Sequence, residues 1–135
     1  MIAVFDSCAI IALLRNETGG DVTRSFLEDT GITNLIHSVN LCEIYYDALR
    51  VYGESRADEL LVTLQEAGLL VRDDMDEQFW KTAGRIKAGG RISLADCFAA
   101  ALTLREDALL ITADRHEFEP LATNGVLQNR VRFIR

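Results

Sequence analysis

The stretch Ala108-Leu109-Leu110-Ile111-Thr112 has the clearest strand pattern in the sequence, and Asp114 follows two residues after it ends. A short, uninterrupted apolar run of this kind is typical of a strand buried on both faces of a sheet. Ile2-Ala3-Val4-Phe5 has the same character and ends directly at Asp6. Three weaker runs predict further strands at 34–37, 69–71 and 131–134.

Helical patterns separate these strands. Apolar side chains spaced at i, i+3 and i+4 predict helices at about 8–15, 21–29, 41–52, 57–67, 76–87 and 93–106. We expect Ser38 or Asn40 to cap the third of them. Short strands that alternate with helices imply βαβ units, so the predicted fold class is α/β, with a parallel sheet covered on both faces. In such a sheet the functional crevice lies outside the carboxyl ends of the strands.

Composition indicates one globular domain spanning residues 1–135. Hydrophobic residues make up 49% and charged residues 26% of the chain, a balance that argues against disorder. The longest apolar run, 8–14, is far shorter than the ~18 residues of a membrane span, and no signal peptide is readable, so we expect a cytoplasmic protein without a membrane segment. The net charge of −7 disfavours nucleic-acid binding by bulk charge alone.

The three cysteines, Cys8, Cys42 and Cys97, favour neither a disulfide framework nor a zinc site. Their number is odd and no C-x-x-C spacing occurs. Each has apolar neighbours, and free cysteine is among the most buried residue types, so we expect all three in the core.

Four acidic residues are predicted at the carboxyl edge of the sheet. Asp6 and Asp114 follow strands, and Glu43 and Asp96 lie in the first turns of helices that begin at this edge. Four unpaired carboxylates repel one another unless some are protonated or a cation is present. Hard oxygen ligands suit Mg²⁺ or Mn²⁺. Two such ions about 4 Å apart can clamp the attacking and leaving oxygens of a phosphodiester.

Each acid also has a purely structural explanation. Ser93-Leu94-Ala95-Asp96 and Asn40-Leu41-Cys42-Glu43 both resemble capping boxes. Asp6 can simply end a strand, and Asp114 can cap a turn. Their joint placement at one sheet edge favours a shared site over four separate caps.

The sequence resembles the PIN-domain ribonucleases, and among them the toxins of VapBC-type toxin–antitoxin pairs, over nearly its whole length. The blocks that carry the resemblance are VFDS at 4–7, SVNLCEI at 38–44, SLADC at 93–97, and LITAD at 110–114 followed by Phe118. The resemblance implies a three-layer α/β/α domain with a mainly parallel sheet of about five strands. A departure is Cys8, since a small polar residue is common there in the family.

The resemblance also implies a function. Asp6, Glu43, Asp96 and Asp114 match the family's metal-binding acids, and Ser7 and Thr112 match the small hydroxyl residues that support them. By this likeness the chain is an endoribonuclease that uses one or two Mg²⁺ or Mn²⁺ ions and leaves a 5′-phosphate and a 3′-hydroxyl. A homodimer and a cognate antitoxin are implied as well. No DNA-binding motif occurs in this chain, so any contact with DNA is expected to come from that partner.

Basic residues are candidates for RNA contact. The densest stretch comprises Lys81, Arg85, Lys87 and Arg91, and Arg15 and Arg115 lie close in sequence to the acids. A solvated helix face explains the same stretch equally well. We interpret Glu117 as a solvated charge rather than a fifth acid of the site, and His37 as a packing residue.

Two alternatives remain open: a PIN-like RNA-processing nuclease outside a toxin–antitoxin pair, and a non-catalytic module that binds RNA or protein. The presence of all four acids favours catalysis. A phosphoryl-accepting domain would need a lysine after a late strand, and a dehalogenase-type phosphatase would need an acid at position 8. The sequence meets neither requirement.

Overall fold

The structure, a computed structural model, describes residues 1–135 and is built around a five-stranded sheet in the order β3-β2-β1-β4-β5. All four strand pairings are parallel. The strands are β1 (Ile2–Phe5), β2 (Thr33–His37), β3 (Leu69–Arg72), β4 (Leu109–Thr112) and β5 (Val131–Phe133). The helices are α1 (Ser7–Leu14), α2 (Gly20–Glu28), α3 (Ser38–Tyr52), α4 (Glu54–Glu66), α5 (Glu77–Ala88), α6 (Leu94–Arg105) and α7 (Arg115–Thr123).

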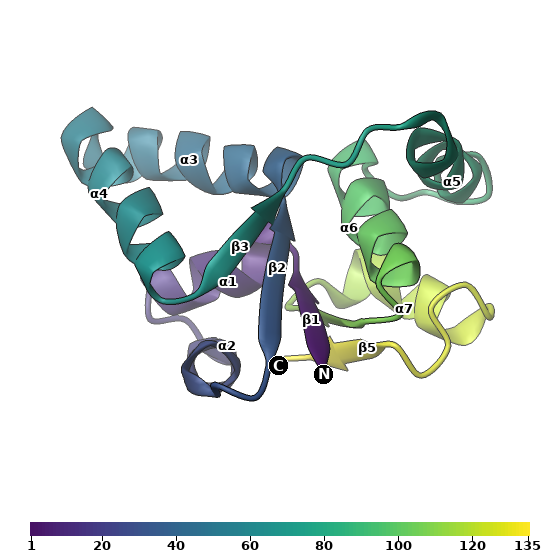
Figure 1. Cartoon of the computed structure of the whole chain (residues 1–135), viewed down its shortest axis with the longest axis horizontal. Helices are drawn as coiled ribbons and strands as arrows, with labels where there is room; N and C mark the ends of the chain where they lie inside the picture. Colours follow the sequence, from purple (N-terminus) through teal and green to yellow (C-terminus); the bar gives the residue numbers. More distant parts are fainter.

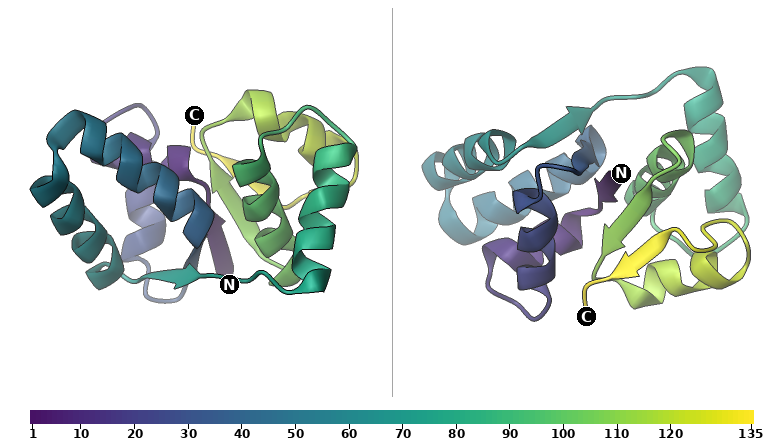
Figure 2. Two further views of the ribbon diagram at one scale, coloured as in Figure 1. Left: turned by 90° about the horizontal axis from the view of Figure 1, so that it is seen from above. Right: turned by 60° about the horizontal axis from the view of Figure 1, so that its bottom comes forward.

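Alternating side chains of the strands build one core on each face of the sheet. Val4, Leu35 and Leu110 pack with residues of α5, α6 and α7. Phe5, Ile36 and Ile111 point the other way and pack with residues of α1, α3 and α4. Figures 1 and 2 show these two groups of helices on opposite sides of the strands. The predicted three-layer α/β/α fold is therefore confirmed.

The chain reverses its direction across the sheet between β1 and β4. From β1 it moves outward to β2 and then to β3, whereas β4 pairs on the other side of β1 and leads outward to β5. Ligands of open α/β sheets bind at the carboxyl end of such a switch point. Asp6 follows β1 and Asp114 follows β4, so the two aspartates flank it.

The start of α3 and the segment after β4 differ from expectation. Neither Ser38 nor Asn40 caps α3, because β2 runs directly into the helix and the Nδ1 atom of His37 accepts the hydrogen bond from Val39 N–H instead. After β4 the structure has a whole helix, α7, where the sequence predicts only a turn capped by Asp114. Pro120 lies inside α7 and weakens its sequence signal, because proline cannot donate a helical hydrogen bond.

The cysteines are less buried than expected. Cys97 lies in the core, Cys8 is half-buried and Cys42 is exposed on α3. The prediction of a buried residue is therefore wrong for Cys42, because it lies on a different side of the helix from the core-facing Ile44 and Ala48.

His37 connects the sheet to the α5–α6 pair. Its ring is fully buried and lies nearly parallel to the rings of Phe79 of α5 and Phe98 of α6, with its centroid 5.2 Å from each. The two phenylalanine centroids are 6.0 Å apart, so the three rings form a triangular cluster. Since Nδ1 accepts from Val39, the ring carries its proton on Nε2, which donates to the Asp74 carbonyl oxygen at 2.9 Å. The expectation that His37 is a packing residue is thus confirmed.

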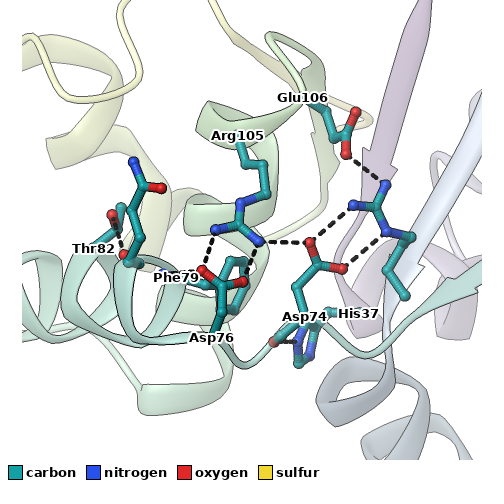
Figure 3. Close-up of polar contacts among 9 residues, drawn as sticks. His37, Asp74, Asp76, Phe79, Thr82, Arg105 and Glu106 are labelled. Atoms are coloured by element: carbon teal, nitrogen blue, oxygen red, sulfur yellow. Dashed lines mark hydrogen bonds and ion pairs between the residues drawn. The ribbon is translucent and has the colours of Figure 1, made fainter.

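Ion pairs fasten the connection between β3 and α5 to the end of α6 (Figure 3). Asp74 accepts hydrogen bonds from both Arg72 and Arg105, at 2.8 and 2.9 Å. Arg105 also holds Asp76, the N-cap residue of α5, through two further bonds. Together these contacts set the position of α5 against α6.

None of the seven helices has the length and apolar character that crossing a membrane requires.

Candidate metal centre

Asp6 is held at the end of β1 by hydrogen bonds from α1 and β4. Its side chain is almost fully buried, and Oδ1 accepts a hydrogen bond from Ala9 N–H at 3.1 Å, which caps α1. The Oδ2 atom accepts from the Thr112 hydroxyl at 2.5 Å. Asp6 therefore caps α1 with one of its two carboxylate oxygens, a role beyond simply ending a strand.

Thr112 links the two strand ends. Besides donating to Asp6, its Oγ1 accepts a hydrogen bond from Asp114 N–H at 2.9 Å. Asp114 in turn caps α7, since its Oδ1 accepts from Glu117 N–H at 3.0 Å. One buried hydroxyl thus fixes both aspartates at the switch point.

At the start of α6, the capping arrangement differs from the one the sequence suggests. Ser93 Oγ accepts from Asp96 N–H at 3.2 Å, which is the first half of a capping box. The second half comes from Glu117 of α7, whose Oε2 accepts from Ser93 N–H at 3.2 Å. Because Glu117 fills that place, the Asp96 carboxylate has no capping role, and Ser93 is the one side chain whose hydrogen bonding opposes the rise of its pKa.

Glu43 approaches from α3. Its Oε1 atom accepts from the Ser7 hydroxyl at 3.0 Å and lies 3.4 Å from the Asn40 amide nitrogen. The Ser7 bond joins the start of α1 to the second turn of α3, 36 positions away in the sequence. The other oxygen, Oε2, has no donor in the protein.

The acids act on one another electrostatically. Burial raises the pKa of Asp96 from 3.8 to about 7, with further increases from the charges of Asp6, Glu117 and Glu43. Burial likewise raises the pKa of Asp6 to about 6, although hydrogen bonds from Thr112, Cys8 and Ala9 N–H oppose the increase. The neighbouring charge of Asp114 adds to the increase at Asp6. These charges link Asp96 with Asp6 and Glu43, and Asp6 with Asp114, so each of the four predicted acids interacts with at least one other.

Carboxylate oxygens of Asp96, Asp114 and Glu117 lie within 4.8 Å of one another. A hard divalent cation suits this set, because it is ligated by oxygen and would neutralise charges that burial makes costly. The N-termini of α1, α6 and α7, which begin beside these acids, offset part of the repulsion. The interpretation of Glu117 as a solvated charge is wrong, since α7 turns its side chain back onto Ser93 and toward Asp96.

Cys8 forms part of the wall beside Asp6. Its Sγ lies 3.1 Å from each oxygen of the Asp6 carboxylate and 3.6 Å from Thr112 Oγ1. Burial, reinforced by the charge of Asp6, raises the pKa of the thiol well above its usual range, so Cys8 stays a neutral hydrogen-bond donor to Asp6.

The basic candidates divide into two groups. Arg91 lines a cavity of about 320 Å³ together with Glu117, between the α5–α6 loop and α7. Lys87 donates to the Ile92 carbonyl oxygen in the same loop region. Arg115 directly follows Asp114, but its side chain donates to the Arg135 carbonyl oxygen and pairs with Glu119. Arg91 and Lys87 are thus the two basic candidates in the loop region that leads to Asp96.

The remaining basic candidates have other surroundings. Lys81 pairs with Glu77 on the exposed side of α5 and shares a surface hollow with Arg85 and Asp76. Arg15 caps the C-terminal end of α1 and pairs with Asp47 at 2.6 Å. Lys81 and Arg15 are thus engaged in ion pairs of their own.

Sequence reasoning missed two residues at the centre, Glu117 and Asn40. A signal for Glu117 was its place three residues after Asp114 and directly before the buried Phe118. Asn40 lies four residues before Ile44 and eight before Ala48, so it is a polar residue on the buried face of α3. Because buried polar side chains are normally hydrogen-bonded, a polar residue at a core-facing position indicates a contact with another element.

The chain matches the PIN domain family over residues 3–123, whereas no curated protein matches its sequence. Three solved structures share the fold. A toxin–antitoxin complex from Klebsiella pneumoniae has 18% identity and a TM-score of 0.72, covering 98% of each chain. VapBC-1 from nontypeable Haemophilus influenzae has 20% identity and a TM-score of 0.73, covering 99% of this chain and 98% of the other. DNA-bound VapBC from Salmonella typhimurium has 20% identity and a TM-score of 0.74, covering 100% and 99%.

At these identities the solved structures show likeness of fold. The family match adds more, because it extends from β1 through the whole of α7 and so includes every segment that carries an acid of the candidate metal centre. The chain belongs to the PIN domain family, whose proteins are nucleases.

Proposed function

We propose that the protein is a metal-dependent endoribonuclease whose ligands are Asp6, Glu43, Asp96 and Asp114. The observation that carries the proposal is the buried Asp96 carboxylate. Burial raises its pKa, the charges of Asp6, Glu117 and Glu43 add to the rise, and a hydrogen bond from Ser93 alone opposes it. An ionised carboxylate in such surroundings is costly without a cation. The oxygen ligands favour Mg²⁺ or Mn²⁺, with one or two ions bound.

The acids and the residues that hold them have defined tasks in the proposed reaction. Asp6 and Asp114 are held by Thr112 and by their helix caps, and Ser7 holds Glu43, so the ligand oxygens are fixed before substrate binds. A bound divalent ion supplies Lewis acidity and lowers the pKa of water. Attack by water on phosphorus breaks the P–O3′ bond, and the two water protons end on the 3′-oxygen and in solution. The products are a 5′-phosphate and a 3′-hydroxyl.

The proposed substrate is single-stranded or looped RNA, held by phosphate contacts from basic residues. Arg91 and Lys87 lie in the loop region that leads to Asp96, and we rank them above Arg115, Arg85, Lys81 and Arg15. Phosphate contacts of this kind position RNA but do not select its sequence.

We further propose that the protein is the toxin of a type II toxin–antitoxin pair, with a cognate antitoxin and a homodimeric assembly as partners. The similar solved structures from Klebsiella, Haemophilus and Salmonella are toxin–antitoxin or VapBC assemblies, and their coverage of nearly the whole chain supports this assignment. Exposed Tyr46, Val51, Tyr52 and Val62 on α3 and α4 supply apolar surface for an interface. In this view, contact with DNA belongs to the antitoxin.

Cleavage of a mixed, structured RNA by the purified chain tests the nuclease assignment. We expect cutting with Mg²⁺ or Mn²⁺, none with excess chelator, and loss of at least about a hundredfold in rate for Asp96→Asn. Asp73→Asn is the matched control, because Asp73 is exposed and forms no ion pair. It should cut like the parent.

The outcomes separate the alternatives. RNA binding without cutting at any divalent-ion concentration would contradict the enzyme and support a non-catalytic module. Cutting that no co-expressed neighbouring protein inhibits would favour an RNA-processing nuclease over a toxin.

A further inference from the structure

Asn40 is a polar residue on the buried face of α3, where the other buried side chains are apolar. It is fully buried in the first turn of α3, on the face that also carries Ile44 and Ala48. Its Nδ2 atom lies 3.4 Å from Glu43 Oε1 and 3.2 Å from the Ala95 carbonyl oxygen. Ala95 immediately precedes Asp96 in the first turn of α6, 55 positions further along the chain.

These contacts fix the orientation of the Asn40 amide. Turning it over would place its oxygen against two other oxygens, so the nitrogen must be the atom that faces Glu43 and Ala95. The amide oxygen then accepts no hydrogen bond from any protein group, although it is buried. A buried polar atom left unpaired destabilises a fold, and an apolar side chain of similar volume would avoid that cost. Stability alone therefore does not account for an asparagine at this position.

The amide accounts for a geometric feature of the acidic centre. Glu43 Oε1 is approached by two donors, Ser7 Oγ and Asn40 Nδ2, which leaves Oε2 as the oxygen available to a cation. The same amide group ties α3 to the turn that carries Asp96. α3 and α6 belong to opposite sides of the sheet, and this bond crosses between them.

We propose that Asn40 is a positioning residue that sets the spacing between Glu43 and Asp96 by bonding Glu43 Oε1 and Ala95 O at once. This inference rests on the proposed function. It assigns Asn40 a role through Glu43 and no contact with the cation or with RNA. Outer hydrogen-bond partners of metal ligands typically change metal affinity by 10–100-fold when removed.

Asn34 supplies a matched control within the same molecule. It too is buried, its Nδ2 donates to a backbone carbonyl, that of Phe26, at 3.1 Å, and its amide oxygen has no partner. It lies in β2 and contacts none of the acids. Asn34 and Asn40 therefore share their burial and their hydrogen-bond chemistry, and differ in their link to the proposed site.

The test compares Mn²⁺ binding by the folded parent, Asn40→Leu and Asn34→Leu, using titration calorimetry, with melting temperature as a check on folding. We expect Asn40→Leu to weaken Mn²⁺ binding about tenfold or more and Asn34→Leu to stay within about twofold of the parent. Raising Mn²⁺ should restore the RNA-cleavage rate of Asn40→Leu, which a structural defect alone would not allow. If Asn40→Leu does not fold, Asn40→Ala replaces it.

Coupling with Ser7→Ala gives a second readout. Ser7 and Asn40 both act on Glu43 Oε1. The loss of Mn²⁺ affinity in the double variant Ser7→Ala with Asn40→Leu should therefore differ from the product of the two single losses. The double variant Ser7→Ala with Asn34→Leu should match that product. Equal Mn²⁺ affinity of the parent and the folded Asn40 variant would overturn the positioning role while leaving the nuclease assignment intact. A parent that neither binds Mn²⁺ nor cuts RNA would overturn both.

Discussion

Asp96 bears the largest electrostatic strain among the acids of the candidate metal centre. Glu117 takes the capping bond that Asp96 would otherwise make, so the buried Asp96 carboxylate has Ser93 as its one hydrogen-bonding side chain. Its pKa of about 7 exceeds the ordinary value of 3.8, because of burial first and nearby negative charge second. The folded chain therefore binds a proton here that the unfolded chain releases above pH 4.

The metal-free protein should lose stability as the pH rises from about 4 to 7, and Asp96→Asn should reduce this loss. The raised pKa means that the protonated form favours folding, and its contribution is fully present below pH 4 and lost as the pH passes about 7. At pH 8 we expect Asp96→Asn to stabilise the metal-free protein by up to about 4 kcal/mol. Urea unfolding with chelator at several pH values measures the effect.

Saturating Mg²⁺ should remove most of this pH dependence in the parent. Asp58→Asn on the exposed side of α4 serves as a control that should follow the parent. A metal-free Asp96→Asn protein less stable than the parent at pH 8 would contradict the charge assignment.

At the residue scale the sequence predicted the four acids from their relation to strands and helix starts, and the structure brings them to one sheet edge. It could not predict Glu117 and Asn40 in the same way. Glu117 reaches Ser93 across 24 positions of sequence, and Asn40 reaches Ala95 across 55. Contacts between residues so far apart in the sequence depend on how the layers pack, and a local sequence pattern does not predict them.

The helix pair α5–α6 depends on a few polar contacts at the start of α5. Arg105 holds Asp74 and Asp76, and its guanidinium also stacks on the Phe79 ring at 5.1 Å (Figure 3). Burial alone would raise the pKa of Asp74, yet hydrogen bonds from Arg72 and Arg105 lower it below its ordinary value. The hydrogen bonds from Arg105 lower the pKa of Asp76 to about 2.

Arg105→Gln should loosen α5 while leaving the sheet in place. We expect the backbone amides of α5 to exchange several-fold faster in this variant than in the parent, because Asp74 and Asp76 lose their shared partner. In the parent, acid should have the same effect, since the contribution of Asp76 is present above pH 4 and lost as the pH falls through about 2. Hydrogen-exchange mass spectrometry measures both.

Arg56→Gln is the matched control, because its pair with Glu59 on α4 is exposed on both sides. It should leave exchange unchanged. Equal exchange of α5 in Arg105→Gln and Arg56→Gln would show that apolar packing alone holds the helix.

His37→Ala should destabilise the protein by about 3 kcal/mol. The change removes a buried ring from its cluster with Phe79 and Phe98, the cap of α3 and the bond to the Asp74 carbonyl. His116→Ala, at an exposed position of α7, should stay within about 0.5 kcal/mol of the parent. Urea unfolding at pH 7.5 distinguishes them, and a loss below 1 kcal/mol for His37→Ala would refute the packing role.

At the element scale all five strands and six of the seven helices follow from the sequence pattern. Those six helices have amphipathic spacing or clear start and stop signals, such as Ser93 before α6 and Gly53 between α3 and α4. The seventh helix, α7, has only Phe118 and Leu121 buried and carries Pro120, so its periodicity is weak. Asp114, the N-cap of α7, is also an acid of the candidate metal centre, so its capping signal does not by itself indicate a helix.

For the whole molecule, the net charge of −7 means that the proposed RNA substrate would have to be bound by local positive charge near the acids. Arg91 borders the cavity lined by Glu117, whereas Lys81 lies on α5 and is paired with Glu77. We therefore expect Arg91, and not Lys81, to contact a phosphate.

Arg91→Ala should weaken RNA binding several-fold and lower the slope of log affinity against log salt by about 1. Lys81→Ala should change neither quantity much, because its charge is already paired. Fluorescence anisotropy of a labelled RNA on the Asp96→Asn protein, which should not cut, measures both across salt concentrations. Identical losses in the two variants would indicate diffuse attraction to the whole basic stretch.

The bond from Thr112 to Asp6 joins residues 106 positions apart, and Asp96, Asp114 and Glu117 all come from the last third of the chain. During translation, a ribosome that has made two thirds of the polypeptide holds Asp6 and Glu43 but neither Asp96 nor Asp114. β4 must then leave the exit tunnel and pair with β1 before these groups meet. Under the proposed nuclease function, a nascent or prematurely terminated chain that lacks these acids should cut no RNA, so activity waits for the end of synthesis.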